Sequence, residues 1–192
     1  QPQPPAATPT PAPNNPIVAT PAPSPSPVTT GAVAGARTCR PVVEKTPVGN
    51  RLPTGCPLMA DPMIITSPFG YRIHPVYGTR RMHRGIDISA TMGTDVFAAA
   101  DGTVTTVVTN PKVDPCGIYI KITHDNNYVS TYCHLSKALV KQGERVSAGC
   151  RIGQVGSTGV STGPHLHYAI TPDAKNPIDP TTMIKHCGYK QR

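Results

Sequence analysis

The stretch GSTGVSTGPHLHYAI, residues 156–170, joins a loop of small residues to a short β-rich segment that carries two histidines. His165 and His167 are two positions apart, so on a strand their side chains lie on one face, about 6.6 Å apart. Both imidazoles could then bind one ion, or one could bind while the other faces a neighbouring substrate. On most strands such a pair does neither, so the rest of the chain has to supply the partners.

Short runs of the same kind fill the second half of the chain, separated by Gly, Asn, Asp or Pro. They are rich in β-branched residues, and none keeps a 3.6-residue apolar period for three turns. The expected strand regions are 94–110, 117–125, 128–135, 144–156 and 164–171. We therefore predict an all-β fold, a compact domain of antiparallel β-sheet whose loops carry the chemistry. One short helix is expected at 179–186, capped by Asp179 and with Pro180 at its first position.

Composition divides the chain into three parts. Residues 1–36 carry no charge and are crowded with Pro, Ala, Ser and Thr, so they cannot bury enough apolar surface to fold. We expect a disordered, extended tether there, which either lets a catalytic head work away from its anchor or is a plain spacer. Residues 37–63 show little periodicity and are expected to wrap the core. Residues 64–192 are expected to form the main domain.

The charge of the chain narrows the choice of partners. There are 18 Lys and Arg against 10 Asp and Glu, a net charge of +8, which favours nucleic acid, acidic lipid or acidic cell-wall polymer. Nucleic acid is not expected, because with two Phe and no Trp the chain lacks interleaved aromatic and basic residues for stacking bases. No stretch approaches 18 consecutive apolar residues, so no membrane span is expected.

Six cysteines, none in a CxxC pair, favour disulfides over structural zinc. The expected pairs are Cys39–Cys56, Cys116–Cys133 and Cys150–Cys187, and buried free thiols are the alternative. The middle pair has the strongest basis, because residues 116–133 form two β-rich runs around the turn HDNN. Disulfides indicate an oxidising compartment such as a periplasm. The chain begins at Gln1, as expected if a signal segment has been removed or the sequence is part of a longer one.

Further metal-binding residue types occur in MHRGIDIS, with His83 and Asp87, and in TYCHLS, with His134. A zinc hydrolase uses three His, Asp or Glu ligands and keeps one position open for a metal-activated water. Residues four apart on a straight strand are about 13 Å apart, too far to share an ion. His83 and Asp87 can therefore do so only if the chain bends between them, which Gly85 permits. The residues alone predict a cluster of histidines and a carboxylate, with zinc as a candidate metal.

Three segments in this order resemble a known family. HRGIDISATMGTDVFAAADGTV, HLS and the stretch at 156–170 are similar to lysostaphin/LytM-type zinc metalloendopeptidases of bacterial peptidoglycan. The similarity covers roughly residues 64–186 and includes TSPFGYRIHPVYG and NPIDPTTMI. It implies a small antiparallel β domain with a groove over the metal, in agreement with the predicted strands.

The resemblance also implies a role for individual residues. The implied ligands of one Zn²⁺ per chain are His83, Asp87 and His167. His165 would face the attacking water and the scissile peptide as base or transition-state stabiliser, and His134 would support it from the neighbouring strand. Arg72 and His74 would line the substrate groove, although they could equally stabilise their loop. After HxH the family commonly has an aromatic and then an acidic residue, whereas here Ala169 follows Tyr168. This departure leaves the substrate preference open.

The implied function is zinc-dependent cleavage of peptide stems or cross-links of bacterial peptidoglycan by a periplasmic or secreted enzyme. Peptidoglycan would be its partner, and the tether could bind an envelope complex. One alternative is a catalytically silent wall-binding or activator module, a type that usually lacks some zinc ligands. Another is a disulfide-rich structural or adhesin module without metal. The enzyme is favoured because all three ligand positions and both accessory histidines are present.

Overall fold

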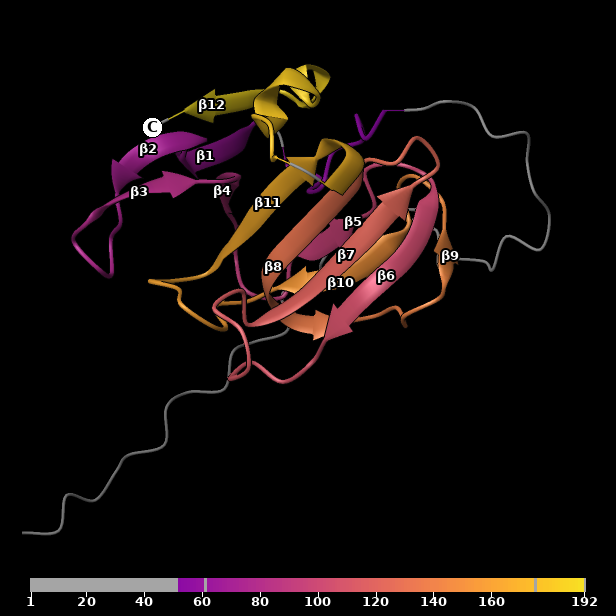
Figure 1. Cartoon of the computed structure of the whole chain (residues 1–192), viewed down its shortest axis with the longest axis horizontal. Helices are drawn as coiled ribbons and strands as arrows, with labels where there is room; N and C mark the ends of the chain where they lie inside the picture. Colours follow the sequence, from indigo (N-terminus) through magenta and orange to yellow (C-terminus); the bar gives the residue numbers. More distant parts are fainter. Residues whose placement is uncertain (1–51, 61, 175, 192) are drawn as a thin grey trace, which may run out of the picture. The chain divides into compact units, whose positions relative to one another are not determined.

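The structure is a computed structural model that describes residues 52–60, 62–174 and 176–191 (Figure 1). The expected tether at 1–36 and the following residues up to 51 lie outside the described residues. Within the described part, strands predominate and the prediction of an all-β fold is confirmed. No helix in these residues has the length and apolar character needed to cross a membrane.

The strands are β1 (Met63–Ser67), β2 (Gly70–Ile73), β3 (Arg80–His83), β4 (Ile86–Ser89), β5 (Asp95–Phe97), β6 (Gly102–Val108), β7 (Ile118–His124), β8 (Val129–Ala138), β9 (Arg145–Val146), β10 (Arg151–Val155), β11 (His165–Thr171) and β12 (Tyr189–Gln191). Three short 3₁₀ turns follow β11: η1 (Pro172–Ala174), η2 (Pro180–Thr182) and η3 (Lys185–Cys187).

One large sheet carries most of the domain, in the order β12-β1-β4-β11-β8-β7-β6-β9, and β10 joins it by pairing with both β8 and β5. Strands β2 and β3 form a separate hairpin. Among the described strands every pairing is antiparallel except that of β1 with β12. Figure 1 shows β11 and β8 side by side in the middle of the sheet.

Alternation along β11 separates the core from the opposite face of the sheet. Leu166, Tyr168 and Ile170 are fully buried and pack in the core. Burying an apolar side chain of this size contributes roughly 1.5–3 kcal/mol to stability. His165 and His167 alternate with them and therefore point to the other face, as expected for a period of two. The apolar residues thus fix the direction in which both histidines point.

The described part of the expected wrapping segment packs along β5. The amide of Gly55 donates to the carbonyl of Ala99, and the amide of Phe97 donates to the carbonyl of Pro57. Leu58 is almost completely buried in the core. The expected boundary between residues 63 and 64 falls within β1, which begins at Met63.

The disulfide pairing differs from the prediction in two of three bonds. Cys116–Cys133 is present and closes the β7–β8 hairpin, as predicted. The predicted pairs Cys39–Cys56 and Cys150–Cys187 are wrong, because Cys56 is bonded to Cys187. Cys150 is a buried free thiol in the core, and Cys39 lies outside the described residues. The parallel pairing of β1 and β12 explains why Cys56 bonds to Cys187, because it brings the segment before β1 close to the turn before β12.

Two predicted elements are divided in the structure. The region 94–110 forms β5 and β6 with a bend between them, and 144–156 forms β9 and β10. The expected helix at 179–186 is not continuous but consists of the turns η2 and η3. Asp179 still caps the first of these, since its Oδ1 accepts a hydrogen bond from the amide of Thr181.

Candidate metal centre and groove

Three separate strands contribute the predicted metal ligands. His83 is the last residue of β3, Asp87 lies in β4 and His167 lies in β11. The antiparallel register of β4 and β11 places Asp87 directly opposite His167. His83 and Asp87 come together because β3 belongs to the hairpin and β4 to the large sheet, so the chain bends between them. This is the bend that the spacing required.

Gly85 matters at this bend through the space that it leaves. A Cβ atom there would lie 2.5 Å from the carbonyl oxygen of Tyr168 and 2.8 Å from Cε1 of His167. Real Cβ atoms do not make contacts this short, so a side chain would push β11 away from the bend. The glycine therefore allows the imidazole of His167 to lie against the turn between the other two predicted ligands.

The predicted ligand atoms converge on one point. His83 Nε2 is 3.1 Å from Asp87 Oδ1 and 3.0 Å from His167 Nδ1, and Asp87 Oδ1 is 2.8 Å from His167 Nδ1. Bond lengths near 2.0–2.1 Å in a tetrahedral zinc site place ligand atoms about 3.3 Å apart. Two imidazoles and one carboxylate at these separations fit zinc with a fourth position open.

Hydrogen bonds outside this cluster orient two of its members. His83 Nδ1 lies 2.8 Å from the carbonyl oxygen of Pro68, which can only accept, so Nδ1 carries the proton and Nε2 presents its lone pair to the centre. Asp87 accepts a hydrogen bond from Arg72 Nη2 on Oδ2, at 3.3 Å, which leaves Oδ1 for the centre.

The electrostatics of the cluster favour a charged Asp87 and a neutral His167. Burial acts to raise the pKa of Asp87, but hydrogen bonds and charge interactions with His167 and His83 outweigh it and hold the pKa well below its usual range. Burial lowers the pKa of His167 and so favours its neutral form. A carboxylate and neutral imidazoles are the protonation states in which these groups bind a metal.

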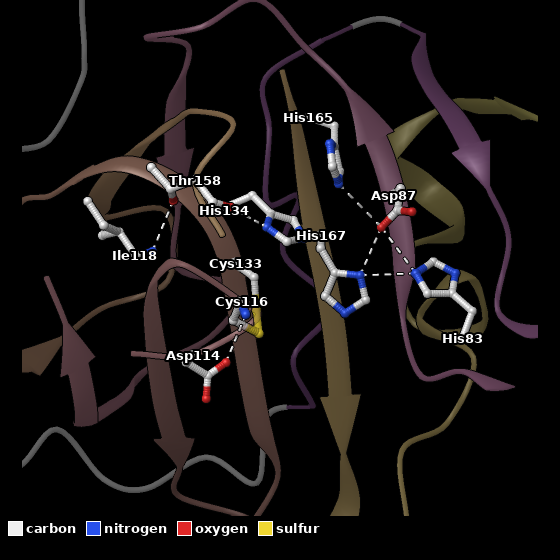
Figure 2. The surroundings of a disulfide bond; sticks show 10 residues. All are labelled: His83, Asp87, Asp114, Cys116, Ile118, Cys133, His134, Thr158, His165 and His167. Carbon is white, nitrogen blue, oxygen red and sulfur yellow. Dashed lines mark hydrogen bonds and ion pairs between the residues drawn. A yellow bond between two sulfur atoms is a disulfide. The ribbon is translucent and has the colours of Figure 1, made fainter. Parts of the chain in front are cut away.

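The rings of His165 and His134 lie beside the predicted ligands (Figure 2), and their hydrogen bonds indicate the same tautomer. His165 Nδ1 donates to the carbonyl of Gly163 at 2.8 Å, and His134 Nδ1 donates to the carbonyl of Thr158 at 2.7 Å. Each therefore has its Nε2 lone pair free to accept a proton. His165 Nε2 lies 3.8 Å from Asp87 Oδ1, and the ring centroids of His134 and His165 are 4.7 Å apart.

His134 has an unusual backbone conformation. Its φ of 62° lies in the left-handed region, which a residue other than glycine rarely adopts. Before it, β8 pairs with β11, up to Cys133 opposite His167; after it, β8 pairs with β10, from Leu135 opposite Val155. Burial lowers the pKa of His134 to about 4, partly offset by the hydrogen bond to Thr158. The side chain is therefore neutral at neutral pH.

All seven predicted site residues surround one groove of about 330 Å³. They are Arg72, His74, His83, Asp87, His134, His165 and His167. Within this set His74 also shapes its own loop, because its Nδ1 accepts from the amides of Val76 and Tyr77. His74 therefore both lines the groove and supports its own loop.

Several groups around the groove were not predicted from the sequence. The carbonyls of Pro68, Thr158 and Gly163 orient three histidines, and a main-chain oxygen leaves no signal in a sequence. Arg81 and Arg84 also line the groove, but the net charge of the chain did not indicate their place. Aside from Asp87, the described residues that line the groove include no acidic side chain.

Comparison with known proteins gives consistent matches. The sequence model of peptidase family M23 matches residues 81–180. The peptidoglycan DD-endopeptidase ShyC of Vibrio cholerae is 46% identical over 108 residues, which are 55% of this chain and 24% of that protein. A zinc-containing peptidase from Vibrio cholerae has a similar structure, with a TM-score of 0.55 at 39% identity over 60% of this chain and 35% of that one.

The match to an isolated catalytic domain is more complete. The catalytic domain of the antimicrobial peptidase lysostaphin from Staphylococcus simulans superimposes with a TM-score of 0.56 at 32% identity, covering 62% of this chain and 89% of that domain. By contrast, this chain spans about a quarter of the length of the curated relatives that it matches. The similarity therefore concerns the catalytic domain.

Proposed function

Because the chain belongs to peptidase family M23, we propose that it is a zinc-dependent endopeptidase that cleaves peptide stems or cross-links of bacterial peptidoglycan. The observation that carries the proposal is the mutual separation of 2.8–3.1 Å among the three ligand atoms on the floor of an open groove. Relatives named as peptidoglycan DD-endopeptidases support the substrate class.

His83, Asp87 and His167 would hold the ion. Zinc bound there would act as a Lewis acid that polarises the peptide carbonyl and makes water a nucleophile near neutral pH. Arg72 holds the second carboxylate oxygen of Asp87, so that a single oxygen is directed at the centre. The carbonyl of Pro68 fixes the tautomer of His83 in the same way.

His165 and His134 would act in proton transfer. His165 bonds to the Gly163 carbonyl through Nδ1 and directs Nε2 at the centre, so Nε2 is placed to take a proton from the attacking water and return it to the leaving amine. His134 lies beside it and is neutral at neutral pH, so it does not repel a protonated His165. It can also accept a hydrogen bond from substrate or water. Positioned groups of this kind typically contribute about 10²–10⁴-fold to the rate.

The groove suits an anionic cell-wall polymer. Arg81 and Arg84 lie along its wall, and the chain as a whole has a net charge of +8. Peptide stems of peptidoglycan carry free carboxylates, which a basic wall attracts. An enzyme of this kind would work in the periplasm or outside the cell, where disulfides also persist.

The test is a mass-resolved digest of two purified peptidoglycans, one directly cross-linked and one glycine-bridged, with and without chelator. Zinc-restored release of muropeptides is expected, and the product masses will identify the bond. The His167→Ala variant provides the matched inactive control. If folded, zinc-loaded protein releases nothing from either wall, the alternative of a silent wall-binding or activator module replaces the enzyme.

A further inference from the structure

We infer that the Cys116–Cys133 disulfide positions His134 for catalysis, and that it does more than stabilise the fold. The inference rests on the proposed function, because it assigns His134 a part in turnover. The bond is near the groove, since both Cys116 and His134 line it. Its contacts set it apart from the other disulfide of the described residues.

Two links connect Cys116 to the short segment 133–134. The first is the disulfide to Cys133, a residue with no exposed surface. The second is a hydrogen bond of 2.8 Å from the amide of His134 to the carbonyl of Cys116. One residue of the 114–118 loop thus holds the side chain of Cys133 and the backbone of the histidine that follows it.

These links act at the one residue of β8 that has a left-handed backbone. At φ 62° His134 is in a strained conformation, which a residue other than glycine keeps only where its surroundings enforce it. A relaxed, extended backbone at this position would turn the side chain away, because successive residues of a strand point to opposite faces. Holding the kink therefore keeps the imidazole in the groove.

The 114–118 loop is itself anchored and cannot simply follow His134. Asp114 Oδ1 accepts from the amide of Cys116 at 2.8 Å, and the amide of Ile118 donates to Thr158 Oγ1 at 3.0 Å. Figure 2 shows these contacts next to the disulfide. The loop also meets the following segment closely, since the amide of Val160 donates to the carbonyl of Pro115.

Thr158 makes two further hydrogen bonds that hold His134 in place. Its carbonyl accepts from His134 Nδ1 at 2.7 Å, and its hydroxyl donates to the carbonyl of Leu135 at 2.7 Å. The same residue therefore orients the ring of His134 and holds the backbone on its far side. Disulfide and threonine together fix both the kink and the rotation of the ring, which leaves Nε2 directed at the centre.

The second disulfide offers an internal control. Cys56–Cys187 joins residues 131 apart, whereas Cys116–Cys133 joins residues 17 apart, so removing the former should cost more stability. Among the described residues that line the groove, none lies in 52–60 or 185–191. A variant without Cys56–Cys187 should therefore be the less stable of the two and yet keep its turnover.

The experiment compares Cys116→Ser/Cys133→Ala with Cys56→Ser/Cys187→Ser, using zinc-loaded protein and a soluble cross-linked muropeptide. For the first variant we expect kcat to fall roughly 10–100-fold, as for a misplaced catalytic group, with zinc content unchanged and KM within about twofold. For the second we expect wild-type kcat. Wild-type kcat in the first variant, or an equal loss in both, would overturn the inference.

A double-mutant cycle tests whether the disulfide acts through His134. In the His134→Ala background, removing Cys116–Cys133 should cause little further loss of kcat, because the group that it positions is gone. Independent, multiplicative losses would show that the bond acts on something else and would refute the assignment.

If the disulfide variant does not fold, Thr158→Val and Thr158→Ser test whether turnover depends on the positioning of His134. Valine removes the hydroxyl that ties Leu135 and Ile118 together, whereas serine keeps it. Thr158→Val should lower kcat and Thr158→Ser should restore it, again only when His134 is present. Equal kcat in the valine and serine variants would show that the Thr158 hydroxyl does not position His134. Failure of wild-type protein to cleave any substrate would instead refute the proposed function, so the two failures are distinguishable.

Discussion

Arg72 Nη2 lies 3.3 Å from Oδ2 of Asp87, on the carboxylate oxygen that does not face the other predicted ligands. Oδ1 of the same carboxylate is 2.8 Å from His167 Nδ1. The guanidinium therefore holds the carboxylate in a single orientation, with one oxygen for the ion. Arg72 comes from β2 of the hairpin and Asp87 from β4 of the large sheet, so this ion pair also ties the two sheets together.

Arg72→Ala should weaken zinc binding by about 10–100-fold, because a ligand that has lost its orienting partner binds less tightly. Arg72→Lys should recover part of the affinity, since it keeps the charge but not the planar donor. Competition with a chromophoric chelator measures both. Arg81→Ala is the matched control, because Arg81 lines the same groove while its Nε bonds to Thr79. Wild-type affinity in Arg72→Ala would contradict the role of this arginine.

His83→Ala, Asp87→Ala and His167→Ala should each abolish zinc binding and turnover together. His165→Ala should keep the metal and lose about 10²–10⁴-fold in kcat, because it removes a proton acceptor and no ligand. Metal analysis of the purified variants, beside the digest, separates the two classes. If His165→Ala lost zinc while His167→Ala retained it, the roles within the pair would be reversed.

Gly85→Ala should destabilise the protein by about 1–3 kcal/mol and weaken zinc binding, because the new Cβ would overlap the carbonyl of Tyr168 and the ring of His167. Urea denaturation and chelator competition report the two effects. Gly163→Ala is the control, since a Cβ there meets no atom within 4 Å. Equal stability of the two variants would show that the bend tolerates a side chain.

Loss of Cys56–Cys187 should lower the free energy of unfolding by about 5 kcal/mol and loss of Cys116–Cys133 by about 3 kcal/mol, from the lengths of the loops that they close. Urea denaturation measures both values. Peptide mapping without reduction should recover these two linked pairs, with Cys150 alkylated only after unfolding because it is buried. A Cys150–Cys187 peptide would contradict the structure.

His124 should make stability depend on pH. It is buried at the end of β7, with Nδ1 donating to the carbonyl of Asp101, and burial lowers its pKa below 6.5. The unfolded chain therefore binds the proton first, so the stabilisation is present above about pH 6.5 and is lost as the pH falls. Unfolding by urea at about pH 7.5 and 5.5 should show a smaller loss in His124→Gln than in the wild type. Equal losses would exclude His124 as the cause.

The sequence predicted the parts of the site that depend on periodicity. A period of two places His165 and His167 on one face, and the apolar residues between and after them identify the face that is buried. The need for a bend between His83 and Asp87 followed from strand geometry alone. The hairpin of β2 and β3 was not predicted, because its second strand, RRMH, contains no β-branched residue and is largely exposed.

Long-range contacts and main-chain conformation were beyond the sequence. The Cys56–Cys187 bond spans 131 residues and depends on a parallel pairing of short strands that have no sequence signature. The left-handed backbone of His134 is likewise invisible, since glycine is the residue that usually indicates such a conformation. Both features result from tertiary packing, which a local pattern does not encode.

The pairing of β1 with β12 brings Met63 opposite Tyr189, and the amide of Met63 donates to the carbonyl of Gly188. The Cα atoms of Cys56 and Cys187 are 5.6 Å apart, so a linker from the end of β12 back to Leu52 would keep this disulfide and the buried Leu58 in place. New ends could then be opened at the exposed turn 141–143, which lies between β8 and β9. The order of the strands along the chain can thus be permuted circularly while the groove and its histidines keep their neighbours.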